Sequence, residues 1–63
     1  MHSGDIVFFP IKQGFIKYII KNVIDDELFV ISFRSKRTNC IDLKDVIKYD
    51  DFIKIYKNEQ IFE

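Results

Sequence analysis

The sequence predicts a small all-β domain, on three observations. Short runs rich in Ile, Val, Phe and Tyr alternate with turn-forming residues through most of the chain, whereas helical periodicity is weak there. Apolar residues make up 48% of the chain and aromatic residues 16%, enough to fill one modest core without disulfides. A chain of 63 residues has no room for a second core. We therefore expect residues 1–63 to form one domain, ordered over about 5–57 with frayed ends.

Turn residues separate the first three predicted strands. We expect the first strand over residues 5–9, ended by Pro10, which has no N–H for a ladder. The second strand covers residues 15–23, and the acidic turn at residues 25–27 follows it. The third strand covers residues 28–33.

The second half of the chain supplies at least two more strands. The polar segment 34–37 is short and predicts a hairpin connection into a fourth strand over residues 38–43. Residues 43–46 then predict a single tight turn, which leads into a brief fifth strand at residues 46–49.

The segment after residue 49 fits two structures. Four residues there fall at helical spacing: Tyr49, Phe52, Ile53 and Tyr56. However, Ile53 and Ile55 also alternate with Lys54, as in a strand. We favour a sixth strand over residues 52–56 that pairs with the first, because it would cover an exposed sheet edge. Five or six short antiparallel strands with one turn before the fifth outline a small SH3-like barrel.

Composition excludes several classes of function. Ten basic and ten acidic residues cancel, so the domain has no long-range field toward nucleic acid or an anionic membrane. One cysteine and one histidine cannot supply a disulfide or a structural zinc site, and this cysteine usage suits a reducing cytoplasm. No secretory signal and no apolar run near ~20 residues is present, so we expect no membrane partner.

Catalysis is the weakest hypothesis for this chain. Its single histidine, His2, lies in the terminus that we expect to fray, and the carboxylates are confined to turns. Cys40 alternates with Ile41 and Leu43, so it falls on the less apolar face and is expected to be inert. With no acid–base pair or nucleophile, we expect no enzyme activity, metal, cofactor or small-molecule substrate.

Two segments carry a family resemblance. The run Gly4-Asp5-Ile6-Val7-Phe8-Phe9, followed by Gly14-Phe15-Ile16 and Ile19, resembles the opening of KOW and Tudor-like barrels, where G-D-x-V and G-x-V-x-x-V begin strands one and two. Residues 46–55 look like the closing pattern of an uncharacterised family of tiny bacterial SH3-like barrels. The resemblance implies that Gly14 lies in a loop that contacts RNA or a protein. This chain departs from the pattern in residues 10–13 and in its weaker basic character.

The predicted topology separates the loop charges into two poles. Alternate connections of an antiparallel meander lie at the same end, which brings Lys12 near the basic loop at residues 34–37 and sends the acidic turn to the other end. Phosphate contacts and base stacking there would bind single-stranded nucleic acid. The candidate nucleic-acid-binding residues are Lys12, Phe15, Tyr18, Arg34, Lys36 and Arg37. Against this, a short charge run is more often a solvated hairpin tip, and Asp50 and Asp51 would neutralise the pole.

The first strand offers a second candidate surface. Its alternation places Val7 and Phe9 inside and leaves Ile6 and Phe8 outside, where an exposed Phe8 would mark a protein interface. The alternative is that the C-terminal segment folds over Phe8 and buries it.

We therefore expect a non-enzymatic accessory module that binds RNA or DNA weakly through the basic pole. The alternative is a protein-interaction module or small inhibitor, including a homodimer, that docks through Ile6, Phe8 and an exposed strand edge. A cage for a methylated cation, made by Phe15, Tyr18 and Phe33, is a more remote possibility.

Overall fold

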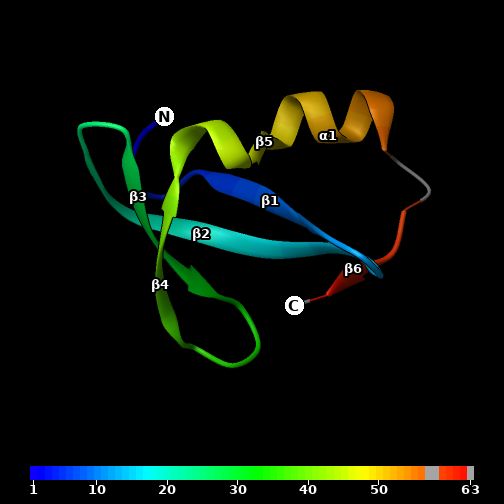
Figure 1. Ribbon diagram of the computed structural model, residues 1–63, viewed down its shortest axis with the longest axis horizontal. Coiled ribbons are helices and arrows are strands. Elements are labelled where there is room, and N and C mark those ends of the chain that lie inside the picture. The colour runs from blue at the N-terminus through cyan, green and yellow to red at the C-terminus, as the bar shows by residue number, and fades with distance from the viewer. Residues whose placement is uncertain (57–58, 63) are drawn as a thin grey trace.

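A computed structural model describes residues 1–56 and 59–62, which form one bent six-stranded sheet with two short helices (Figure 1). The elements are β1 (Ile6–Ile11), β2 (Gly14–Ile24), β3 (Glu27–Ser32), β4 (Thr38–Asp42), the 3-10 helix η1 (Leu43–Asp45), β5 (Ile47–Lys48), α1 (Tyr49–Ile55) and β6 (Ile61–Phe62). Strands β4, β3, β2, β1 and β5 lie side by side in that order, each antiparallel to its neighbour. This arrangement confirms the predicted all-β class.

The sixth strand is not the one predicted. Strand β6 pairs in parallel with β2, through Phe15 with Ile61 and Ile16 with Phe62. Strand β3 pairs with β2 only from Tyr18 onward, because it is shorter than the eleven-residue β2. The edge that β3 leaves open at the start of β2 is therefore covered by β6.

Pro10 does not end the first strand, which continues to Ile11. Pro10 lies opposite Phe15, whose N–H donates to the backbone oxygen of Gln60 at 2.9 Å rather than across to β1. The pair is thus a non-hydrogen-bonded one, and the missing N–H of proline removes no bond to β2.

Gly14 is required by the close approach of the C-terminal segment. Its φ of 150° lies in the region that favours glycine, and a Cβ at this position would collide with the backbone oxygen of Gln60. The resemblance assigned this glycine to a contact with a partner. In the structure, the chain's own backbone fills the space beside it.

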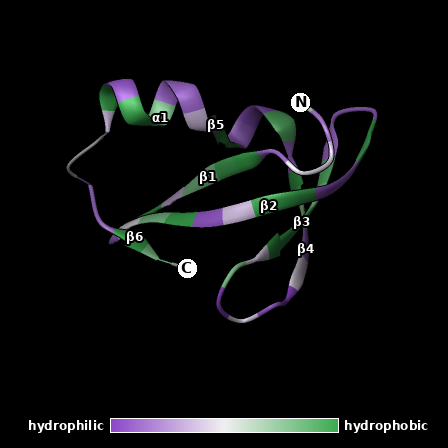
Figure 2. Ribbon diagram, turned by 180° about the vertical axis from the view of Figure 1, so that it is seen from behind, coloured by the Kyte–Doolittle hydropathy of each residue, from purple (hydrophilic) through white to green (hydrophobic). Residues whose placement is uncertain are grey.

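The interior of the barrel holds the main core. It is built by Val7, Tyr18, Ile20, Leu28 and Val30, all buried, and hydrophobic segments follow β1 and β2 through it (Figure 2). The half-buried Phe9 packs against this cluster. The predicted inward orientation of Val7 and Phe9 is confirmed.

A second, aromatic cluster covers the outer face of β1 and β2. Helix α1 lies over this face (Figure 1), and Phe52 stacks on Phe8 with ring centroids 3.8 Å apart and planes at 14°. Phe15 meets Phe52 edge-on at 5.0 Å and lies 4.9 Å from the ring of Tyr56. Phe8 is 2% exposed, so the prediction that it forms a free surface anchor is wrong. Ile6, at the start of the same face, packs against this cluster and is half-buried.

The predicted strand over residues 52–56 is also wrong, because residues 52–55 belong to α1 and Tyr56 is its C-cap. Phe52 and Tyr56 lie four positions apart, so the helical turn directs both rings at the apolar outer face. Ile53 and Ile55, whose alternation with Lys54 favoured a strand, are both exposed. Phe8 and Phe15 are both buried under the helix, which removes their aromatic surface from water.

We predict that Phe52→Ala lowers the free energy of unfolding by about 3 kcal/mol, because it leaves a cavity between Phe8 and Phe15. Urea denaturation followed by circular dichroism measures the change. Ile55→Ala, on the exposed side of the same helix, is the control and should change stability by less than about 0.5 kcal/mol. Equal effects of the two substitutions would show that α1 does not pack on the sheet in this way.

Candidate functional site

The basic side chains of the predicted nucleic-acid site are exposed. Arg34, Lys36 and Arg37 lie together in the β3–β4 loop, and Lys12 lies in the separate β1–β2 loop. The β3–β4 loop is shaped by hydrogen bonds from Lys36 N–H to the backbone oxygen of Ser32 and from Ser32 N–H to that of Arg37, both 3.2 Å. These bonds fix the backbone of the loop and leave its cationic side chains in solvent.

The two aromatic residues predicted to stack on bases are not available for that role. Tyr18 faces the barrel interior, where its hydroxyl accepts a hydrogen bond from Asn39 Nδ2 at 3.4 Å. Phe15 lies on the opposite face of β2, under Phe52 and Tyr56. Because the two rings are buried on different faces, they form neither a stacking platform nor, with Phe33, a cage for a methylated cation.

A groove of about 1250 Å³ opens on the outer face of the sheet, and we call it the α1–β6 groove. Its lining comes from α1, β6, the outer face of β1 and β2, and the start of the β3–β4 loop. The lining residues are Phe8, Lys17, Phe33, Arg34, Tyr49, Phe52, Ile53, Gln60, Ile61 and Phe62.

Large apolar side chains gather at this groove although they are exposed. Within residues 1–56 and 59–62, six large apolar side chains are exposed, and four of them line the groove: Tyr49, Ile53, Ile61 and Phe62. Phe8 and Phe52 form its floor, because their stack closes the space between β1 and α1. The groove is therefore an apolar surface with a rigid aromatic base.

One wall of the groove is positively charged. Lys17 and Arg34 are the charged residues among its described lining, which includes no carboxylate. The ammonium of Lys17 lies 4.7 Å from the centroid of the Phe33 ring, a cation–π contact that holds both side chains at the rim.

Sequence reasoning missed this groove because α1, which was predicted as a strand, supplies three of its ten lining residues. The sequence did contain a signal, the helical spacing of Tyr49, Phe52, Ile53 and Tyr56. This spacing places Phe52 and Tyr56 against the sheet and Tyr49 and Ile53 beside the groove. Ile6 and Phe8, the predicted interface residues, belong instead to the packed cluster beneath α1.

Cys40 is exposed on β4 and is a poor nucleophile. Its thiol donates a hydrogen bond to Glu27 Oε2 at 3.1 Å, and this bond raises the pKa of the thiol above its ordinary value. Slight desolvation and the negative charges of Glu27 and Asp42 raise the pKa further. Little thiolate therefore forms at neutral pH.

The described residues bring together no group of three or more metal-ligating side chains. In the same part of the chain, none of the helices has the length and apolar character needed to cross a membrane. No family model, curated protein or solved structure matches the chain. The resemblance to KOW and Tudor-like barrels therefore stays a prediction.

Proposed function

We propose that this domain is a non-enzymatic binding module that docks on another protein through the α1–β6 groove. The convergence of Tyr49, Ile53, Ile61 and Phe62 on one groove carries the proposal. Monomeric proteins rarely leave several large apolar side chains exposed together, and such patches commonly mark interaction sites. Aromatic residues also contribute much of the energy of protein interfaces.

The charge of the groove indicates the chemistry of the partner. The exposed guanidinium of Arg34 lines one wall. A segment with large apolar side chains and neighbouring carboxylates would complement both the floor and this wall. The partner we propose is therefore an acidic, apolar segment of another protein.

The size of the groove supports a polypeptide occupant. Pockets for small molecules usually enclose ~300–1,000 Å³ and bury most of the ligand. This groove is larger, at about 1250 Å³, and is bordered by side chains that remain exposed.

A reducing cytoplasm suits the module, since Cys40 is an exposed thiol with no second cysteine in the chain.

Weak binding of single-stranded nucleic acid is the second candidate function. The observation that favours it is the exposure of Arg34, Lys36 and Arg37 on one short loop beside the half-buried Phe33. These side chains would contact phosphates without reading sequence. The burial of Phe15 and Tyr18 removes the predicted stacking platform, so we rank this function below protein docking.

We predict that a peptide selected from a displayed random library against the full chain will be rich in large apolar and acidic residues. Ile53→Asn should weaken its binding about tenfold or more, because the substitution removes apolar surface from the groove. Fluorescence anisotropy of the labelled peptide measures the affinity. Ile24→Asn is the matched control, because Ile24 is 51% exposed and Ile53 47%, yet Ile24 does not line the groove. Equal loss in both variants, or no loss in either, would contradict the proposal.

For nucleic acid, we predict salt-sensitive binding of a mixed-sequence single-stranded RNA through the β3–β4 loop. Three phosphate contacts would give a slope of about −2 for log affinity against log salt concentration. Reversal of Arg34, Lys36 and Arg37 to Glu should abolish this binding. Anisotropy of a labelled RNA at several salt concentrations tests it, and unchanged binding by the triple variant would rule the loop out.

A further inference from the structure

Strand β4 forms an uncovered edge of the sheet. It stands at one end of the strand order and pairs only with β3 among the described residues. Natural sheets usually protect such edges with Pro, Lys, bulges or very short strands. Strand β4 spans five residues, Thr38–Asp42, and contains neither Pro nor Lys. Its backbone is therefore suited to pair with another strand.

The hydrogen bonds of β3 show which groups of β4 face the open side. Ser32 N–H donates to the Arg37 oxygen at one end of the β3–β4 ladder, and Leu43 N–H donates to the Asp26 oxygen at 2.8 Å at the other end. Both end pairs are therefore hydrogen-bonded pairs. Antiparallel pairs alternate between bonded and non-bonded positions. The outward backbone groups are thus those of the alternate residues Thr38, Cys40 and Asp42.

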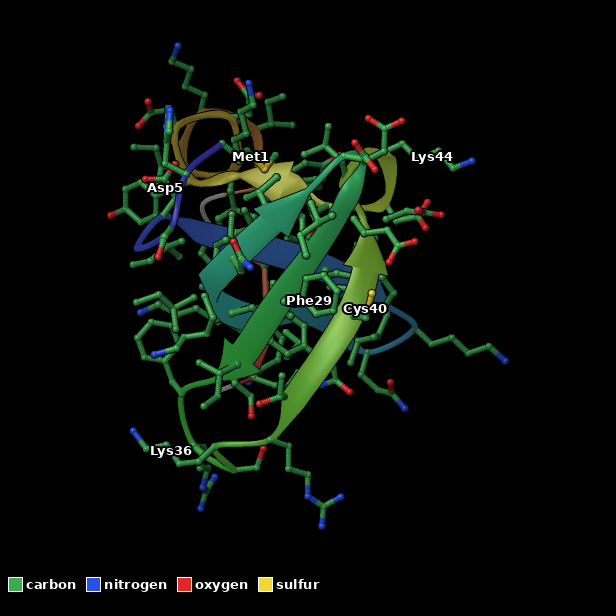
Figure 3. All side chains as sticks on the ribbon, turned by 90° about the vertical axis from the view of Figure 1, so that its left-hand side faces the viewer. Met1, Asp5, Phe29, Lys36, Cys40 and Lys44 are labelled. Atoms are coloured by element: carbon green, nitrogen blue, oxygen red, sulfur yellow. The ribbon has the colours of Figure 1, made fainter. Side chains whose placement is uncertain are left out.

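The two ends of this edge carry opposite charges. The exposed charged side chains at the β3–β4 loop are the basic residues Arg34, Lys36 and Arg37. The exposed acidic residues at the other end are Asp25, Asp26, Glu27, Asp42 and Asp45, with Lys44 among them. Figure 3 shows this polarity along the β3–β4 hairpin: nitrogen-tipped side chains surround Lys36, whereas carboxylate oxygens gather near Lys44.

We propose that β4 pairs antiparallel with β4 of a second copy of this chain, about a twofold axis at Cys40. This register pairs all five residues, with Thr38 opposite Asp42 of the second copy, and the hydrogen bonds come from Thr38, Cys40 and Asp42. It also places the basic loop of each copy beside the acidic end of the other copy, so the twofold symmetry gives two such charge contacts. The edge is self-complementary, as a twofold interface must be, so a second copy fits it better than an unrelated strand.

The α1–β6 groove stays accessible in this dimer. No residue of β4 lines the groove, and of the three basic residues of the β3–β4 loop only Arg34 lines it. The dimer would present two grooves to one partner or to two, which raises avidity without any new contact in either groove. The dimer does not depend on the proposed function, and either could fail alone.

Cys40 provides a direct test of the register. Residues opposite each other in a hydrogen-bonded antiparallel pair have Cα atoms about 5.5 Å apart, within the range that a disulfide spans. Copper-phenanthroline oxidation of the full chain should therefore join Cys40 to Cys40 of the second copy. The control is Ile24→Cys combined with Cys40→Ser, whose exposed thiol lies away from the edge and reports random collisions. We expect the Cys40 dimer to form about tenfold faster or more than the control dimer, despite the raised pKa of its thiol.

A charge exchange tests the interface without oxidation. Lys36→Glu or Asp42→Lys alone should weaken dimerisation about tenfold in sedimentation equilibrium, since each change affects two symmetric contacts. The double variant, Lys36→Glu with Asp42→Lys, should recover the dimer. A chain that stays monomeric across the concentration series, Cys40 oxidation no faster than the control, or a double variant no better than the single ones would overturn the proposal.

Discussion

The stack of Phe52 on Phe8, with ring centroids 3.8 Å apart, is the contact on which the rest of the structure depends. It fixes α1 on the outer face of β1 and β2, where two aromatic side chains of the sheet would otherwise meet water. Once α1 is fixed, Tyr49 and Ile53 form one side of the groove, and the chain returns along β2 as β6. Gly14 then admits the backbone of Gln60, so the C-terminal segment packs along the start of β2.

Much of the barrel could be predicted from the sequence because the information is local. Period-two alternation placed Val7 inside, and turn-forming segments separated strands that pair with their neighbours in sequence. Strand β1 exceeded its predicted end because a proline is harmless at a position that donates no ladder bond, a fact set by register rather than by residue type. The β3–β4 loop and the acidic turn were predicted correctly as polar connections.

The groove could not be predicted because it depends on whether residues 49–56 form a helix or a strand, and tertiary packing decides between the two. Residues 49–56 satisfy both the helical and the strand period, and a segment of eight residues is too short for either period to dominate. The helix is favoured by its packing on Phe8 and Phe15, which lie far from it in the sequence and form one buried cluster with Phe52. The same choice buried Phe15, and it shifted the exposed apolar surface from Ile6 and Phe8 to Tyr49 and Ile53. Two different elements, α1 and β4, thus present surfaces for association.

Solution NMR of the full chain tests the central claim, the closure of α1 over the outer face, most directly. The account predicts nuclear Overhauser effects between the ring protons of Phe8 and Phe52 and between Phe15 and Tyr56, because these ring centroids lie 3.8 and 4.9 Å apart. It also predicts a helical pattern of sequential effects over residues 49–55. Absence of the Phe8–Phe52 effect, together with an extended pattern over the same residues, would contradict the packing and the groove built on it.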